Sequence, residues 1–165
     1  MKQLKAQHIG LITGATMIGI SLVSFYQFKI PIESNVQLLI YGVFTAGIVC
    51  SLFIFHKTTA KAKNFKDYFS EGFKTFVIVA LLMAVFTFIF FSYNTGFRDD
   101  KIAENNRLLL LEGNKLPKEI EENAKQLRKL FMPIMVSSAM FRYLIIGAII
   151  SLVGAGFLSQ KKTTA

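Results

Sequence analysis

Long uncharged apolar runs dominate the pattern of hydrophobic and polar positions along this chain. Three of them, 9–28, 36–55 and 75–93, carry no Asp, Glu, Lys or Arg over 20, 20 and 19 residues. A helix needs roughly 20 residues to cross a hydrocarbon core about 30 Å thick. A fourth uncharged run begins at Tyr143 and reaches full length when it is extended back to Met140, giving a span at 140–158. The pattern predicts four membrane-spanning helices in a single membrane domain, 1–165.

The segment KAKNFKDYFSEGFKTF separates the second and third of these runs. Phe65, Phe69 and Phe73 recur there at four-residue spacing, with lysines between them. This pattern is typical of a helix that lies in the lipid headgroups. It is weak evidence for a lipid sensor and stronger evidence for a lysine-rich anchor at the cytoplasmic end of ordinary spans, and we favour the anchor.

The stretch 94–131 is the one sizeable region outside the predicted spans. Gly113 and Asn114 supply a helix stop and Pro117 a helix start, and the apolar residues after Pro117 recur at three- and four-residue steps. We therefore expect a helical hairpin that leads into the fourth span, with a kink at Pro133. The predicted fold class is all-α: an integral membrane, antiparallel four-helix bundle with an external helical hairpin between spans three and four.

One face of this external hairpin is a candidate partner surface. Ile120, Ala124 and Leu127 share a face of its second helix, with Glu and Lys on the other faces. The face either docks a partner protein or packs within the hairpin and against the outer ends of the spans.

The charge distribution bears on topology. The net charge is +9, which by itself could indicate nucleic-acid binding, yet only 18% of residues are charged and 53% are hydrophobic. Nine lysines precede span one, separate spans two and three, or follow span four, against two acids in the same segments. The positive-inside rule then places both chain ends on the cytoplasmic side. We read the first run as a retained helix rather than a cleaved signal, and expect no nucleic-acid partner.

Small residues form two candidate helix-packing faces. Gly10 and Gly14 are spaced G-x-x-x-G in span one, and Gly147, Ser151 and Ala155 follow a strict four-residue spacing in span four. Small residues allow helix backbones to approach closely in lipid. They form either a dimerisation face or, as we favour, an intramolecular packing face of spans one and four.

Candidate chemistry is sparse. All ten Asp and Glu lie outside the predicted spans, which argues against a proton-driven transporter. His8 and His56 fall at the same end of spans one and two, but histidine at that level is more often a polar anchor than a metal ligand. Serines and threonines are abundant in the predicted spans, but none has a histidine or lysine placed to activate it. We expect no catalytic residue, no metal site and no cofactor, and therefore no enzyme.

Arg142 is the one charge that can enter the membrane. Six polar aromatic or amide residues are expected near the same outer level: Tyr26, Gln27, Gln37, Tyr41, Tyr93 and Tyr143. An arginine among tyrosines and amides can hold a lipid phosphate or a partner's carboxylate. The candidate lipid or partner contact consists of Arg142, Tyr143, Gln37 and Tyr93.

The order of these features resembles one family. A basic tail after span two, the segment FKDYFSEGFKTF at the start of span three, a helical external loop, and a last helix opened by FRYLI and closed by QKK are similar to the small Bacteroidota membrane proteins catalogued as domain of unknown function 4199. The resemblance covers about residues 5–162. It implies a bacterial inner membrane and four spans, and transfers no activity.

Function follows mostly by exclusion. We expect a non-enzymatic accessory or assembly subunit of a larger inner-membrane complex. The alternative is a small oligomeric transporter or channel. The lipid bilayer is the one partner that the composition requires, with a larger complex or self-association beyond it.

Overall fold

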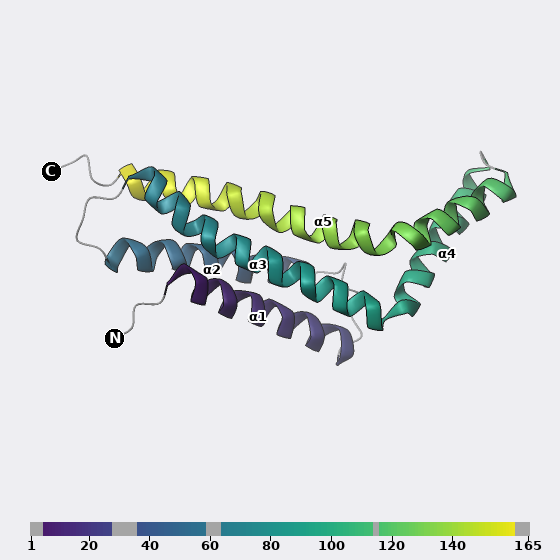
Figure 1. Ribbon diagram of the computed structural model, residues 1–165, viewed down its shortest axis with the longest axis horizontal. Coiled ribbons are helices and arrows are strands. Elements are labelled where there is room, and N and C mark those ends of the chain that lie inside the picture. Colours follow the sequence, from purple (N-terminus) through teal and green to yellow (C-terminus); the bar gives the residue numbers. More distant parts are fainter. Residues whose placement is uncertain (1–4, 28–35, 59–63, 114–115, 161–165) are drawn as a thin grey trace. The chain divides into compact units, whose positions relative to one another are not determined.

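Five helices make up almost all of the described chain (Figure 1). The computed structural model describes residues 5–27, 36–58, 64–113 and 116–160. Its helices are α1 (Ala6–Tyr26), α2 (Val36–Thr58), α3 (Phe65–Tyr93), α4 (Thr95–Glu112) and α5 (Pro117–Gln160). Within these ranges there is no strand, which confirms the predicted all-α class.

Four of these helices are long and apolar enough to cross a membrane. They are α1, α2, α3 and α5, of 21, 23, 29 and 44 residues. At 1.5 Å per residue α1 is about 32 Å long, close to the thickness of a hydrocarbon core, whereas α5 is about 66 Å long. Only part of α5 is therefore needed for one crossing.

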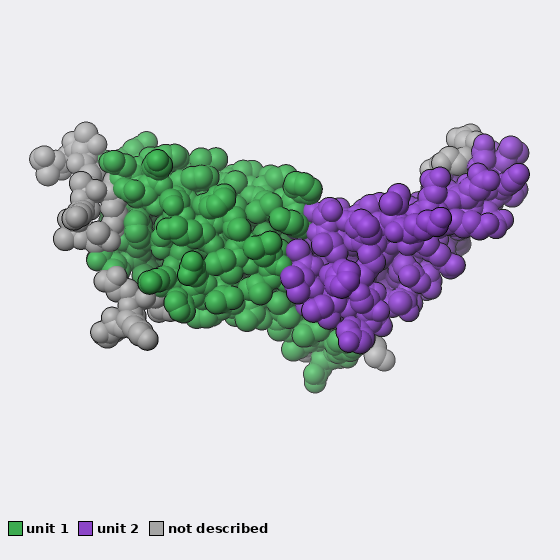
Figure 2. Space-filling model, viewed as in Figure 1, with its two compact units in different colours: residues 1–83, 140–165 green, residues 84–139 purple. Residues whose placement is uncertain are grey.

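The chain divides into two compact units, coloured separately in Figure 2. Unit 1 consists of residues 1–83 and 140–165, and so holds α1, α2, the first part of α3 and the last part of α5. Unit 2 is residues 84–139, which hold the end of α3, α4 and the start of α5. The sequence pattern predicts a single membrane domain, 1–165, and this assignment stays a prediction.

Helix α3 is the common packing partner within unit 1. Glycines of α1 and α5 lie against it, at Thr75 and Ile78 for Gly10 and at Phe76 for Gly147. On the α2 side, Ser51 contacts Thr75. The largest side chains buried in unit 1 come from α1, α2 and α3: Met17, Phe44, Ile48, Leu52, Tyr68 and Val79.

Aromatic rings and an ion pair hold unit 2 together. Phe91 of α3 packs against Phe97 of α4 and Phe131 of α5, each at 5.4 Å between ring centroids. Arg128 of α5 lies 3.4 Å from Asp99 of α4. These contacts pair α4 with the first part of α5, as expected of a helical hairpin.

The signals that end α4 and begin α5 act as the sequence predicts. Gly113 follows the last residue of α4 with φ of 66°, a left-handed conformation that glycine adopts without steric cost. Pro117 is the first residue of α5, where its missing N–H costs no helical hydrogen bond. Asn114 lies outside the described residues.

Two helices extend further than the pattern predicts. α3 begins at Phe65, ten residues before the predicted span at Thr75, so the Phe65–Phe73 stripe continues a long helix instead of forming a separate one. α5 passes through Pro133 without ending there, although proline removes one backbone hydrogen bond.

Candidate functional site

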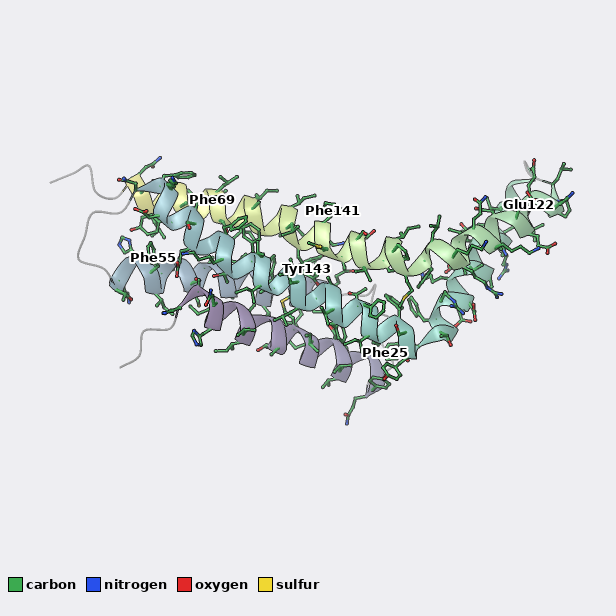
Figure 3. All side chains as sticks on the ribbon, in the orientation of Figure 1. Phe25, Phe55, Phe69, Glu122, Phe141 and Tyr143 are labelled. Atoms are coloured by element: carbon green, nitrogen blue, oxygen red, sulfur yellow. The ribbon has the colours of Figure 1, made fainter. Side chains whose placement is uncertain are left out.

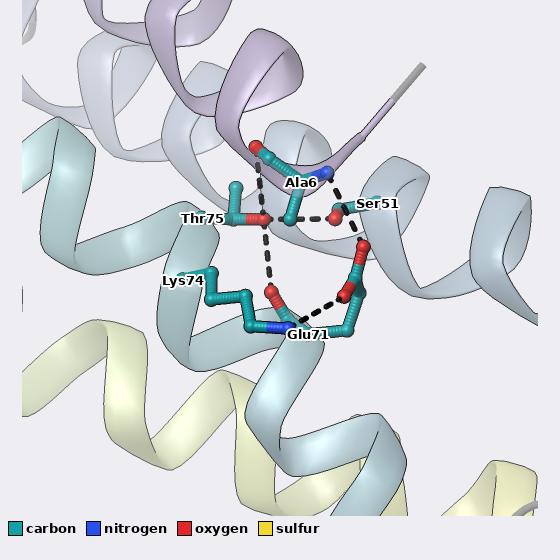
Figure 4. A network of polar contacts seen from close by, with 5 residues as sticks. All are labelled: Ala6, Ser51, Glu71, Lys74 and Thr75. Atoms are coloured by element: carbon teal, nitrogen blue, oxygen red, sulfur yellow. Dashed lines mark hydrogen bonds and ion pairs between the residues drawn. The ribbon is translucent and has the colours of Figure 1, made fainter. Parts of the chain in front are cut away.

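A polar network joins α1, α2 and α3 at the end of unit 1 where α1 begins (Figure 4). The Glu71 carboxylate accepts a hydrogen bond from the Ala6 backbone N–H at 3.2 Å, and lies 3.6 Å from Lys74 Nζ. The first N–H groups of a helix have no partner within the helix, and they carry partial positive charge. Glu71, whose side chain is 15% exposed, therefore caps α1 from α3.

Thr75 occupies the centre of this network. Its buried hydroxyl lies 2.8 Å from Ser51 Oγ and 3.1 Å from the Glu71 carbonyl oxygen, with the Ala6 carbonyl oxygen at 3.5 Å. A hydroxyl has one proton and two lone pairs, so it can bond to α2 and to its own helix at once. The network satisfies polar groups that would otherwise be costly to bury. We call it the α1–α2–α3 polar network.

One turn before Glu71, the buried Tyr68 contacts α2. Its hydroxyl lies 2.6 Å from His56 Nδ1, and the two rings are stacked at 5.8 Å between centroids. His8, in contrast, is exposed on α1. The structure thus gives His56 a neutral hydrogen-bond partner that the sequence pattern does not indicate. Among the described residues, no group of three or more His, Cys, Asp and Glu is placed to hold a metal ion.

Toward the other end of unit 1, Arg142 belongs to a second polar cluster. The Tyr41 hydroxyl accepts hydrogen bonds from Gln37 Nε2 at 3.1 Å and from the Arg142 guanidinium at 3.4 Å. The buried Tyr143 ring packs against Tyr41 at 6.1 Å and against Phe44 at 5.3 Å. We call Gln37, Tyr41, Arg142 and Tyr143 the Arg142 cluster.

The predicted lipid or partner contact is thus brought together in part. Arg142, Gln37 and Tyr143 lie in one cluster around Tyr41, which is also expected at this level. Tyr93 belongs to unit 2, where it is 84% exposed. Tyr41 follows Gln37 by four residues and precedes Phe44 by three, so the three residues share one face of α2.

Both predicted small-residue faces lie against α3. A methyl group added at Gly10 would meet the Thr75 carbonyl oxygen at 2.9 Å, and one added at Gly14 would meet Leu82 at 2.6 Å. On α5, a methyl group at Gly147 would meet Phe76 at 2.5 Å. Ser151 and Ala155 are fully buried, and Ser151 lies against Gly72 of α3. These faces are used for packing within the chain, and each meets α3 instead of the other.

The predicted external partner face is not free. Ile120 is buried, and Ala124 and Leu127 are half-buried, on the part of α5 that pairs with α4. Exposed leucines lie elsewhere on unit 2. They are Leu108, Leu110 and Leu111 of α4, Leu116 just before α5, and Leu130 of α5, all 52–75% exposed.

Asp99 is the electrostatic link within the hairpin. Its carboxylate lies 3.2 Å from Arg98 Nε and 3.4 Å from Arg128 Nε. The hydrogen bond from Arg98, and then the positive charges of Arg98 and Arg128, lower the pKa of Asp99. Glu121 and Lys125, four residues apart on α5, form an exposed ion pair at 2.8 Å.

A family model described as "Protein of unknown function (DUF4199)" matches residues 8–160 of this chain. The chain belongs to this family. The match covers all five helices of this DUF4199 protein except the first two residues of α1. No curated protein and no solved structure matches the chain.

For this DUF4199 protein, sequence reasoning missed the α1–α2–α3 polar network. Glu71 and Thr75 are four residues apart on α3, and Tyr68 is three residues before Glu71, so all three share one helix face. That face continues into the buried Val79 and Met83. The signal was present, but it lay across the boundary between a charged segment and an apolar run.

Proposed function

We infer that the protein is a multi-pass protein of the cytoplasmic membrane of a bacterium, a member of the Bacteroidota as its family resemblance implies. Unit 1 forms an antiparallel four-helix bundle with both chain ends in the cytoplasm. Two contacts support the antiparallel arrangement of α2 and α3. Ser51 of α2 meets Thr75 of α3, and His56, further along α2, meets Tyr68, which comes earlier in α3. The lysine bias supports the orientation. A reporter fused after Ala165 should be active in the cytoplasm, and periplasmic activity would overturn the orientation.

We propose that the protein is a non-enzymatic accessory or assembly subunit of a larger membrane complex, which it binds through the α4–α5 hairpin. The observation that carries this proposal is the set of exposed leucines on unit 2. α4 is not among the helices apolar enough to span a membrane, so something other than acyl chains must cover its exposed leucines. Exposed large apolar side chains that gather outside lipid are typical of a protein interaction site.

The size of the effect follows from Leu108 and Leu111, which are 55% and 75% exposed and three residues apart on α4. They therefore lie on one helix face. Burying a leucine side chain fully contributes about 1.5–3 kcal/mol. Because these two are already partly covered, their burial in an interface would contribute about 2–4 kcal/mol together, or roughly 30-fold to 1,000-fold in affinity.

The test is affinity purification of the tagged protein from membranes in a gentle detergent, followed by mass spectrometry of what is recovered. A stoichiometric larger membrane protein is expected with the wild type. It should be lost with the Leu108→Gln/Leu111→Gln double variant, because glutamine preserves helix propensity while removing the apolar side chains.

The matched control for this test is the Glu121→Gln/Lys125→Gln double variant. It removes an exposed ion pair from the same unit, so it should retain the partner. Recovery of the same partner with the leucine variant, or of homo-oligomers alone with the wild type, would overturn the proposal.

A small oligomeric transporter or channel is the second candidate, and Glu71 is the observation that favours it. This carboxylate belongs to a candidate spanning helix and is largely shielded from solvent. Buried acids in membrane helices often lie on ion or proton pathways. The hydrogen bond from Ala6 and the contact with Lys74 give Glu71 a structural role, which is why this candidate ranks second. Solute or proton flux in liposomes that is lost in Glu71→Gln would favour it.

A further inference from the structure

We propose that the Arg142 cluster is a binding site for the phosphate group of a membrane lipid, in the leaflet on the side of the bilayer away from the α1–α2–α3 polar network. The proposal rests on the membrane placement of unit 1 given above, and is independent of any protein partner. Its basis is an exposed guanidinium on a lipid-facing helix surface, beside a tyrosine hydroxyl with a free proton.

Arg142 lies on the outer surface of α5. Its neighbours on that surface, Phe141, Ile145 and Ile149, are 63, 59 and 56% exposed. Figure 3 shows Phe141 and Tyr143 leaving α5 on different sides, and Tyr143 is buried. A surface of this composition faces acyl chains when the helix is in a membrane. A charged side chain within it must reach the headgroups or find a partner.

The depth of the cluster suits a headgroup ligand. Arg142 is 18 residues from the end of α5 at Gln160, about 27 Å along the helix, and Tyr41 is 17 residues from the end of α2 at Thr58, about 26 Å. A hydrocarbon core is about 30 Å thick. With the far ends of α2 and α5 at one boundary, Arg142 lies a few ångströms inside the opposite boundary, where an extended arginine side chain reaches the phosphate level.

Arg142 and Tyr41 place hydrogen-bond donors side by side. Among residues 5–27, 36–58, 64–113 and 116–160, Arg142 makes no ion pair, and one guanidinium N–H donates to the Tyr41 hydroxyl. The Tyr41 oxygen accepts from both Gln37 and Arg142, so its own proton is left to donate. A phosphate accepts hydrogen bonds from a guanidinium in bidentate fashion and from a hydroxyl alongside it. A carboxylate of a partner protein would have to enter a lipid-facing surface, whereas a lipid phosphate is already at that surface.

The test measures lipid binding by the purified full-length protein in neutral detergent, by native mass spectrometry with dioleoylphosphatidylglycerol. Arg142→Gln should raise the apparent Kd of the tightest-bound lipid tenfold or more, since hydrogen bonds to charged groups are the strong ones. Arg142→Lys should raise it about threefold, because lysine keeps the charge without the planar fork. Tyr41→Phe should raise it about fivefold.

Arg107→Gln is the matched control, because Arg107 is an exposed arginine of α4 in unit 2. It should change the Kd less than twofold. Dioleoylglycerol, which has the same acyl chains without phosphate, should bind equally weakly to the wild type and to Arg142→Gln. Size-exclusion chromatography checks that each variant is folded.

Three results would overturn the proposal. Equal phosphatidylglycerol binding by the wild type and Arg142→Gln would show that the site does not hold lipid. Displacement of the lipid by millimolar inorganic phosphate would show a site for the free anion. Unchanged lipid binding together with equal loss of thermal stability in Arg142→Gln and Glu33→Gln would show an internal ion pair with Glu33, which lies outside the described residues. Failure to recover a protein partner would contradict the proposed function only, because lipid binding is measured separately on the purified protein.

Discussion

Replacing Gly147 by alanine should separate α5 from α3 and destabilise unit 1. The added methyl carbon would lie 2.5 Å from Phe76 Cβ and 2.6 Å from its Cγ, against 3.4–4 Å for ordinary contact. Phe76 is 2% exposed, and its Cβ is fixed to the α3 backbone, so the clash cannot be relieved by a side-chain rotation. The two helices must instead move apart by about 1 Å, and neighbouring atoms lose dispersion contacts as they do.

The magnitude comes from comparing two glycines of the same helix. Gly156→Ala meets nothing within 4 Å, so it should be neutral or stabilise by up to about 1 kcal/mol through helix propensity. Overpacking of a close interface costs about 1–3 kcal/mol. Gly147→Ala should therefore be less stable than Gly156→Ala by about 2 kcal/mol, which corresponds to about 4–8 °C in apparent Tm for a chain of this size.

Fluorescence-detected size-exclusion chromatography after heating measures this difference in detergent, on proteins fused to a fluorescent protein. Light scattering of the unheated variants reports oligomeric state. Equal apparent Tm values for the two variants would refute the close α3–α5 packing. A change of oligomeric state in Gly147→Ala without loss of stability would show that this small-residue face serves dimerisation instead.

Three other predictions follow from the polar contacts. Thr75→Val should lower the free energy of unfolding by about 1–3 kcal/mol by leaving Ser51 without its partner, and Ser51→Ala should add little to it in the double variant, as measured by the same thermal assay. Tyr68→Phe keeps the buried ring but loses the His56 hydrogen bond, and should cost about 1 kcal/mol in that assay, whereas no change would show that the contact is not made. The pKa of Asp99 is lowered, so its stabilisation of the hairpin is fully present above the ordinary aspartate pKa and is lost as pH falls through the lowered value. Hydrogen exchange of α4, corrected for intrinsic rates, should thus be unchanged from pH 7 to 5 and rise at lower pH, and Asp99→Asn should remove that rise.

The four apolar helices could be predicted because the physical requirement is visible along the sequence. A bilayer demands about 20 uncharged residues in a row, and the runs at 9–28, 36–55 and 75–93 meet that demand without reference to tertiary contacts. The stop at Gly113 and the start at Pro117 are equally local, since each depends on the conformational preference of one residue.

The start of α3 could not be placed by the same criterion. Lys66, Asp67 and Glu71 precede the apolar run, so hydropathy places the start of the span at Thr75. The helix itself starts ten residues earlier, at Phe65. Charged residues are compatible with a helix, and Asp67 Oδ2 accepts a hydrogen bond from the Asn64 N–H just before it. Hydropathy reports where lipid begins, while helix ends are set by local hydrogen bonds.

The sequence also could not identify the helix against which each small-residue face packs. Spacing shows that Gly10 and Gly147 each belong to a face that permits close approach, but a spacing within one helix contains no information about the helix opposite. The groups of α3 that meet these glycines are not small residues at a regular spacing. Gly10 faces the Thr75 carbonyl oxygen, and Gly147 faces the Phe76 side chain. For the same reason the sequence could place Tyr41 near the level of Arg142 but could not show that the two side chains meet.

Unit 1 is built from two stretches of chain that are far apart in sequence, and this bears on how a ribosome delivers it to the membrane. The surface of α3 that carries Gly72 and Phe76 is covered by the last helix described, α5. During synthesis, this surface of α3 therefore stays uncovered until the residues of unit 2 have been made and the last part of α5 follows. An insertase or chaperone that shields membrane helices is the kind of factor that would act in this interval.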